Sequence, residues 1–349
     1  MKIMKKGIFC ILVCILMMVS TILPVSGTKV SKTTSQPLTM GNILYVGGSG
    51  PNNYTKIQDA INASITGDTV FVFNDSSPYY ENIVVNTSIS LLGEGKNTTI
   101  INGTINDFNT NLTVNIGVYI NANTVTMRGF TIQGCNLTGI AISSNNNTIT
   151  DNIVADNYNG IGIGYGDLNQ SSSQIGSNNM IINNLFIRDT GGVYVAGGEN
   201  NIIQGNVFFQ AGAGIIVAMS KNNTISHNVI SQGSTGVLII GSYDTVLYRN
   251  NITDNENIGV FAMFTSSDKI LQNNFIGNDK SAVSCQLFLL KIQLFKKELN
   301  FPIRRNVWNE NYWDGPRSLP YKIPGFFKFR CQVDWRPAQK PYDIPRIAI

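Results

Sequence analysis

Short apolar runs alternate with polar turns along most of this chain, with a period of about 22 residues. Each run holds three to five aliphatic or β-branched residues, too few for a helix, and Asn, Gly, Ser or Asp bounds it. Two columns of residues keep the period, and they therefore indicate a repeat fold. The Asn column is Asn152, Asn184, Asn206, Asn228, Asn250 and Asn274, and the Gly column is Gly139, Gly160, Gly192, Gly214, Gly236 and Gly259.

A unit of this length cannot bury its apolar face alone, but stacked units can, because each run pairs in parallel with the same run about 4.8 Å along the stack. Gly suits a tight corner, and Asn suits an internal ladder of side-chain amides. Neither the Leu spacing of a leucine-rich repeat nor the Gly-Gly-x-Gly-x-Asp of a calcium-binding β-roll occurs. The sequence predicts an all-β, single-stranded, right-handed parallel β-helix over residues 42–286.

Residues 1–27 have the features of an export signal, and residues 28–41 those of a polar spacer. Three lysines precede an apolar run, and small residues that suit cleavage follow it. We expect an extracellular or cell-surface protein. The apolar run is nearly long enough to span a membrane, so an uncleaved anchor is the alternative, and the one membrane contact that the sequence suggests.

A short amphipathic helix is predicted at Thr55–Ser64, before the regular coils begin. Thr55 and Gln58 have the spacing of a capping box, and Ile57, Ala60 and Ile61 share one face. A β-helix end is an unpaired edge, and a helix laid across it blocks that edge. We therefore predict an N-terminal capping helix.

Charge narrows the range of partners. Charged residues make up 13% of the chain and the net charge is +4, part of it in the leader and tail. So small a charge gives no indication of nucleic-acid binding. The sequence holds no indication of the oligomeric state.

Four segments of the first coils carry a family resemblance. Tyr54–Asn62, Gly67–Val70, Tyr80–Val85 and Ile89–Gly95 resemble the opening coils of pectin-lyase-like β-helix proteins. The Asn-Thr-Ile-Ser-x-Asn phrase at 223–228 is similar to repeats of NosD-type copper-binding proteins and of carbohydrate-binding and sugar-hydrolase domains. The resemblance spans roughly residues 43–286. It implies the fold strongly and function weakly, because the repeat residues are those that build the coil.

One coil is about ten residues too long, between Gly160 and Asn178, and insertions in a solenoid form loops that often bind ligands. An acidic cluster with aromatic and cationic neighbours is expected there. A polysaccharide lyase needs carboxylates for Ca²⁺ and an Arg or Lys as base, whereas the alternative is solvated turn residues with a surface ion pair. No column supplies the adjacent carboxylates that a glycosidase needs. The candidate residues are Asp156, Asp167, Arg188 and Asp189, with Tyr165 and Tyr194 as ligand-binding neighbours.

The column two residues after the Gly column is predicted to face outward, and its later members are apolar. A bare strip of this kind is unusual on a soluble surface. Either the C-terminal tail covers it, or it is a sugar- or partner-binding face with Tyr194 and Phe261 as stacking platforms. The column is Ala141, Gly162, Tyr194, Ile216, Leu238 and Phe261.

Metal chemistry has little support in the residues. His227 is the one histidine, and the methionines of the coils show no clustered spacing, whereas a copper site needs several converging Cys, Met or His ligands. Copper or calcium would rest on the family resemblance alone, so no cofactor and no metal site is predicted. Arg128 is predicted to replace Asn at the ladder position of its coil.

Residues 287–349 are predicted to form a C-terminal cap and an irregular, Pro-rich, aromatic tail. Their Asn-Tyr-Trp…Asp…Pro pattern resembles the endings of archaeal-type NosD-like proteins, without the Ca²⁺-like Asp-x-Asp-x-Asp stretch of some of them. Trp308 and Trp313 either stack sugars or pack the tail. A disulfide between Cys285 and Cys331 is compatible with export.

Three functions remain open at this point. The preferred hypothesis is an exported, non-catalytic binding or scaffold protein whose partner is a polysaccharide or glycoprotein surface. A polysaccharide lyase or glycosidase using the cluster around Asp156 is the second. The third, implied by the NosD resemblance, is an accessory protein for metalloenzyme maturation.

Overall fold

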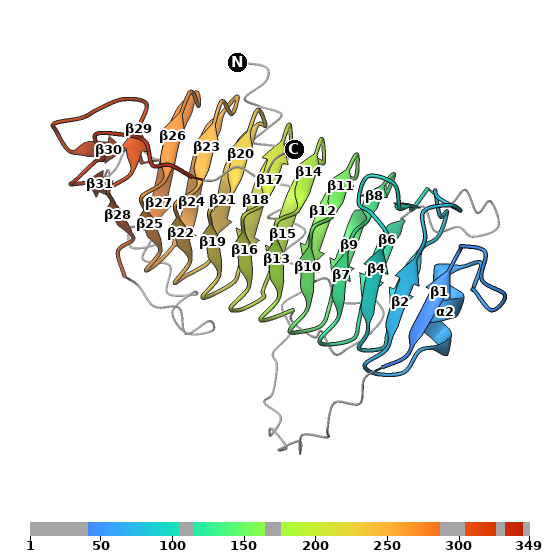
Figure 1. Ribbon diagram of the computed structural model, residues 1–349. Helices are drawn as coiled ribbons and strands as arrows, with labels where there is room; N and C mark the ends of the chain where they lie inside the picture. The colour runs from blue at the N-terminus through green and yellow to red at the C-terminus, as the bar shows by residue number, and fades with distance from the viewer. Residues whose placement is uncertain (1–40, 105–114, 165–175, 287–303, 326–331, 345–349) are drawn as a thin grey trace, which may run out of the picture. The chain divides into compact units, whose positions relative to one another are not determined.

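Successive coils of the chain stack their short strands into three parallel sheets (Figure 1). The computed structural model describes residues 41–104, 115–164, 176–286, 304–325 and 332–344. These ranges belong to one unit, Thr39–Ile349. They form a right-handed parallel β-helix of about ten turns, so the predicted fold class is confirmed. The leader at 1–27 and most of the spacer lie outside the described residues.

Each complete coil contributes one strand to each sheet, and the incomplete coils at the ends give sheet A 11 strands and sheets B and C 9 each. In stacking order, sheet A contains β1 (Ile43–Val46), β2 (Thr69–Val72), β4 (Ser90–Gly93), β7 (Thr126–Arg128), β10 (Thr148–Thr150), β13 (Met180–Ile182), β16 (Ile202–Gln204), β19 (Thr224–Ser226), β22 (Val246–Tyr248), β25 (Lys269–Leu271) and β28 (Val307–Asn309). Sheet B contains β5 (Ile100–Asn102), β8 (Thr131–Gln133), β11 (Ile153–Ala155), β14 (Leu185–Ile187), β17 (Val207–Phe209), β20 (Val229–Ser231), β23 (Asn251–Thr253), β26 (Asn274–Ile276) and β29 (Tyr312–Trp313). Sheet C contains β3 (Ile83–Val85), β6 (Ile116–Ile120), β9 (Thr138–Ile142), β12 (Asn159–Ile163), β15 (Gly191–Ala196), β18 (Ala213–Ala218), β21 (Thr235–Ile240), β24 (Ile258–Thr265) and β27 (Lys280–Gln286).

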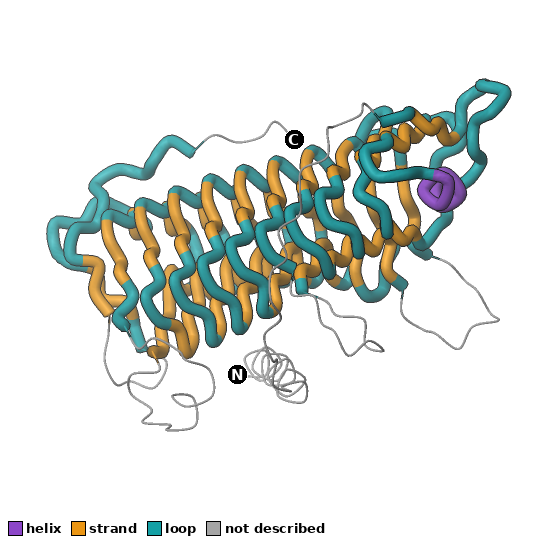
Figure 2. The backbone as a smooth tube through the Cα atoms, turned by 90° about the horizontal axis from the view of Figure 1, so that it is seen from below, coloured by secondary structure: helices purple, strands orange, loops and turns teal. Residues whose placement is uncertain are grey.

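The predicted capping helix is present as α2 (Ile57–Ala63) at the first coil (Figure 2). It buries Ile57, Ala60 and Ile61 against the stack. The predicted capping box is wrong, because no side chain within the helix segment caps it. The carboxylate of Glu81, from the next coil, instead accepts the N–H groups of Ile57 and Gln58 at 2.9 and 3.0 Å. The helix N-terminus is therefore capped by a carboxylate distant in sequence, and not by Thr55 as the local pattern predicted.

Replacing Glu81 with alanine is expected to lower the free energy of unfolding by about 1–2 kcal/mol, because two helix N–H groups lose a charged acceptor. Urea denaturation of the purified protein measures this. Glu256→Ala is the matched control, since Glu256 is an exposed glutamate far along the stack. An equal loss in both variants would show that Glu81 does not cap the helix.

One side chain and one backbone segment close the open edges of the first strands of the stack. The Gln58 amide donates to the Val84 carbonyl at 3.1 Å and accepts the Val84 N–H at 2.7 Å, so it occupies both hydrogen-bonding groups on the open edge of β3. Tyr54 does the same for β1, since its N–H donates to the Tyr45 carbonyl and its carbonyl accepts from Gly47. Both edges are thereby paired within the chain.

The Asn column forms a buried ladder at the corner between sheets A and B. The N–H and the Nδ2 of each Asn both donate to the Oδ1 of the Asn in the next coil, as Asn206 does to Asn228 at 2.9 and 3.1 Å. The last predicted member is wrong. Asn250 bonds Asn273 at 2.9 Å through both groups, and Asn274 lies on β26 opposite Asn251. The coil holds 23 residues between rungs, and two adjacent Asn residues fit the pattern equally well.

This ladder ends on a carboxylate. Asn273 bonds Asn311, whose N–H and Nδ2 donate to Oδ2 of Asp334 at 2.9 and 3.1 Å. Because every rung donates in the same direction, the final rung needs only acceptors, and a carboxylate supplies them. Asp334 is fully buried and also accepts the indole N–H of Trp313 at 3.1 Å.

The stack continues beyond residue 286, since β28 and β29 pair with sheets A and B. The Trp313 ring stacks on Phe275 at 4.6 Å and on Tyr321 at 4.1 Å between centroids, and it is fully buried. Trp308 is 3% exposed. These two indoles therefore form the end of the core, and not a sugar-stacking surface. An antiparallel hairpin of β30 (Tyr321–Ile323) and β31 (Gln332–Asp334) follows.

Candidate functional site

The predicted acidic cluster separates into two unrelated environments. Asp156 and Arg188 form an exposed ion pair with contacts of 2.8 and 2.7 Å at adjacent corner positions. Both residues have left-handed backbone, with φ of 57° and 56°. Tyr165 and Asp167 lie outside the described residues. Because both side chains are exposed to solvent, Asp156 and Arg188 agree with the alternative interpretation of the cluster, a surface ion pair.

Asp189 is 1% exposed and forms part of a second ladder, at the corner between sheets B and C. Its Oδ1 accepts the N–H and the Nδ2 of Asn157 at 2.9 and 3.1 Å. Burial raises the pKa of this carboxyl from 3.8 to about 8. A raised carboxyl pKa often marks a catalytic acid, but here the side chain lies inside the stack among structural amides. Asp189 is therefore a rung of the ladder and not an accessible acid.

The outward column lies on sheet C in the predicted register, with Gly162, Tyr194, Ile216, Leu238 and Phe261 opposite one another in successive strands. Tyr194 is half-buried, but Phe261 is 4% exposed, so its ring presents no open face to a sugar.

The described part of the tail contacts both sheet B and sheet C. Tyr342 exchanges two backbone hydrogen bonds with the Asn274 side chain of sheet B at 2.8 and 2.9 Å. Gly325 forms a parallel bridge with Ser284 of β27 in sheet C, and the Ser284 N–H donates to the Pro324 carbonyl. None of these contacts is with a residue of the apolar column.

The described residues contain no group of three or more His, Cys, Asp or Glu side chains able to hold a metal ion. Burial lowers the pKa of His227, whose ring lies beside Tyr248 with centroids 5.7 Å apart. Cys285 is a buried free thiol in this structure, so the predicted disulfide is not formed, and Cys331 lies outside the described residues. No helix within the described ranges is long and apolar enough to cross a membrane.

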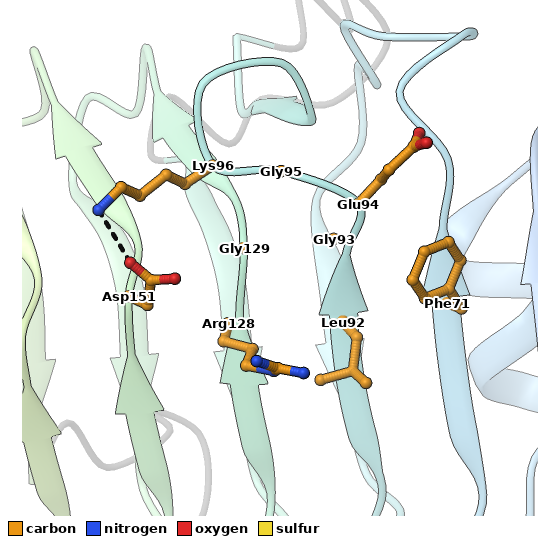
Figure 3. Close-up of a pocket in the computed structure, with 9 residues that line it drawn as sticks. All are labelled: Phe71, Leu92, Gly93, Glu94, Gly95, Lys96, Arg128, Gly129 and Asp151. Atoms are coloured by element: carbon orange, nitrogen blue, oxygen red, sulfur yellow. Dashed lines mark hydrogen bonds and ion pairs between the residues drawn. The ribbon is translucent and has the colours of Figure 1, made fainter.

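A shallow groove of about 200 Å³ lies on the outer face of sheet A near its first coils (Figure 3). Its lining comes from four successive strands and the turn after β4. The residues are Phe71, Leu92, Gly93, Glu94, Gly95, Lys96, Arg128, Gly129 and Asp151.

Arg128 points out of the stack into this groove, so its predicted place in the ladder is wrong. Phe130 occupies the rung instead, since its N–H donates to Asn152 Oδ1 at 3.1 Å. The two positions differ by two residues, with a corner at Gly129 between them. Gly129 has φ of +85°, and a Cβ there would lie 2.4 Å from the Gly93 carbonyl oxygen. This close approach of two coils forms the floor of the groove.

Polar groups cross one side of the groove. Lys96 Nζ contacts Asp151 Oδ1 at 2.8 Å, which links the turn after β4 to the end of β10 across the intervening coil (Figure 3). Glu94 accepts the Asn74 N–H at 2.9 Å. These contacts hold a polar wall in place beside the apolar side chains of the sheet.

An aromatic shelf of Tyr45, Phe71 and Phe73 adjoins the groove on sheet A. The Tyr45 and Phe73 rings stack with centroids 5.8 Å apart, and Phe71 meets Phe73 edge-on at 5.1 Å. Tyr45 is 41% exposed, and the two phenylalanines are half-buried. Three aromatic rings on an outer face beside polar groups are the usual elements of a sugar-binding surface.

Sequence reasoning missed the groove because its parts lie in separate coils of unequal length. The register Tyr45–Phe71–Leu92–Arg128 depends on steps of 26, 21 and 36 residues, which no fixed period predicts. The one feature of the sequence that could have indicated the groove is Gly93-Glu94-Gly95-Lys96, a glycine-rich turn with one acidic and one basic residue.

The comparison with family models gives one finding. Residues 168–318 match the family model described as the periplasmic copper-binding protein NosD. No curated protein sequence matches the chain. The groove residues, 71–151, precede the NosD-matched segment, so the match carries no information about them.

The solved structures that resemble the chain support the fold. The complex of XylC with xylose has a TM-score of 0.56 at 13% identity, covering 70% of this chain and 67% of that one. Pectate lyase Pel9A has a TM-score of 0.50 at 14% identity, covering 80% of this chain and 81% of that one. At these identities the likeness shows a pectate-lyase-like β-helix and nothing about activity.

The histidine of the NosD-matched segment does not meet its methionines at one point in the described part, although Met263 lies opposite Cys285. His227 lies at the corner between sheets A and B, whereas Met219 and Met263 lie at the ends of strands in sheet C. Soft copper sites need several such ligands at one point. These side chains do not converge.

Proposed function

We propose that this chain is an exported β-helix protein that binds saccharide on the outer face of sheet A without cleaving it. The observation that carries the proposal is the aromatic shelf of Tyr45, Phe71 and Phe73 beside a polar groove. Aromatic rings stack on the C–H faces of sugars, and the adjacent charged groups hydrogen-bond to hydroxyls.

The carboxylates support a binding role over catalysis. Glycoside hydrolysis uses two accessible carboxyls on either side of the scissile bond. Asp189 is buried in a ladder, Asp156 is paired with Arg188, and Asp151 is paired with Lys96. Each of the three has a structural partner that accounts for its position.

Two observations support the proposal that the protein is exported. The first 27 residues have the composition of a signal segment. The family model that matches 168–318 describes a periplasmic protein. A chain of this kind meets polysaccharides and glycoproteins at the cell surface.

The role of the aromatic shelf can be tested with one variant in the shelf and one control variant elsewhere. Phe71→Ala is expected to weaken the affinity for the best ligand of a glycan array about tenfold, because the sugar loses its stacking surface. Tyr158→Ala is the control, since Tyr158 is 54% exposed at a corner away from sheet A. Isothermal titration measures both. Equal affinities in all three proteins, or no bound glycan, would contradict the proposal, as would sugar release that Asp156→Ala abolishes.

The NosD match favours a second candidate, an accessory protein for metalloenzyme maturation. Copper titration of the purified protein tests it. Saturable binding at one ion per chain would support this function, and its absence would remove it.

A further inference from the structure

We infer that the saccharide bound at this groove carries an anionic group, and that Arg128 is the residue that recognises it. The inference rests on the proposed function, and it adds the chemical class of the ligand and a specificity-determining residue. Its basis is the arrangement of charges around the groove.

Arg128 is an exposed cation of the groove whose side chain has no partner among the described residues. Lys96 pairs with Asp151, Arg188 with Asp156, and Lys221 with Glu199. The Arg128 backbone is paired in the sheet opposite Leu92, but its guanidinium forms no hydrogen bond or ion pair with any described residue. A guanidinium held at a groove without an internal partner is ready for an external one.

The other charges of the groove do not neutralise it. Asp151 is engaged by Lys96 at 2.8 Å, and that pair has no net charge. The Glu94 carboxylate accepts the Asn74 N–H and extends away from Arg128, whereas the Arg128 side chain extends toward Leu92 (Figure 3). The guanidinium is therefore the cation of the groove that pairs with no described carboxylate.

The position of Arg128 defines what it can reach. Phe71, Leu92 and Arg128 are in register on three successive strands, so the backbones of Phe71 and Arg128 are two strand spacings apart, about 10 Å, and the Arg128 side chain extends toward Leu92 between them (Figure 3). A sugar stacked on the shelf places its neighbour over Leu92 and Arg128. The guanidinium fork binds a carboxylate or a sulfate through two parallel hydrogen bonds.

The test compares an acidic oligosaccharide with its neutral form. The probes are an oligogalacturonate, the same oligomer as its methyl ester, and a sulfated galactan oligomer. Wild-type protein is expected to bind an anionic probe at least tenfold more tightly than the ester. Arg128→Gln should remove that preference and leave the affinity for the ester unchanged, and Arg128→Lys should restore only part of it. The stronger of the two anionic probes identifies the group as carboxylate or sulfate.

Lys269→Gln is the matched control, because Lys269 is an exposed cation on the same face of sheet A, four coils or more from the groove. If Arg128→Gln and Lys269→Gln weaken the preference for the anionic probe equally, that preference is a general effect of positive charge, and the inference is overturned. Equal binding of acid and ester by wild type would also overturn it, while the proposed function would stand. If none of the probes and no arrayed glycan binds, the proposed function itself fails.

Discussion

Replacing Asp189 with asparagine is expected to stabilise the protein at pH 8 by an amount on the order of a few kcal/mol, and to leave it nearly unchanged at pH 4. The reason lies in the ladder. At the asparagine rungs of this corner the side-chain amide donates a hydrogen bond to a carbonyl, as Asn157 Nδ2 does to Ile132 and Asn278 Nδ2 does to Ile252. Asp189 presents Oδ2 at that position, and this buried oxygen has no hydrogen-bond partner among the described residues. An amide restores the missing donor.

The direction in which stability changes with pH follows from the direction of the pKa shift. Burial raises the pKa of Asp189 to about 8 in the folded protein, although the two hydrogen bonds from Asn157 act to lower it. The unfolded chain has the ordinary value near 4. Between these values the folded state holds a proton that the unfolded state has lost. The stabilisation is therefore complete below about pH 4 and is lost as pH rises toward 8.

Thermal unfolding of wild type and Asp189→Asn from pH 4 to pH 9 measures this effect. The two midpoints should agree at pH 4 and separate as pH rises. Asp156→Asn is the control, since Asp156 is exposed. Some slope should persist in the variant because Asp268, also fully buried, has a pKa raised to about 7. Parallel curves for wild type and Asp189→Asn would show that Asp189 is ionised in the folded state.

Replacing Trp313 with alanine is expected to lower the free energy of unfolding by about 3–5 kcal/mol. The indole is fully buried between Phe275 and Tyr321, and its N–H donates to Asp334, which ends the Asn ladder. The substitution leaves a cavity and removes one donor from a buried carboxylate. The last coils should unfold first.

Trp335→Ala is the matched control, because Trp335 is 72% exposed in the same tail, and it should change stability by less than about 0.5 kcal/mol. Urea denaturation followed by circular dichroism separates the two cases. Comparable losses for Trp313→Ala and Trp335→Ala would mean that the indole of Trp313 does not hold the end of the core.

The sequence predicted the body of the fold well because the same physical requirement returns in every coil. Five successive levels of the corner between sheets A and B carry a buried amide, and the period of the sequence identifies all five, Asn152 to Asn250. The sixth failed at an Asn-Asn pair, where polarity alone cannot choose between Asn273 and Asn274. Only the hydrogen bonds of the neighbouring rungs make that choice.

The ends and the candidate site were less predictable because their partners come from other coils. Thr55 and Gln58 have the local spacing of a capping box, yet the helix is capped by Glu81 from the next coil. In the sequence Asp189 cannot be told from an exposed acidic turn residue. In the structure its carboxylate accepts hydrogen bonds from Asn157 of the preceding coil and is part of the buried ladder. The groove around Arg128 depends on coil lengths that vary from one turn to the next.

A stack of parallel coils has no intrinsic length, since each level presents the same backbone groups to the next. One amide, Gln58, occupies the open N–H and carbonyl of Val84 and so terminates one sheet. Without such terminators a second molecule can continue the stack, and growth of this kind proceeds into fibrils. Substitutions at these end residues should therefore promote aggregation more than equal changes in the middle of the stack.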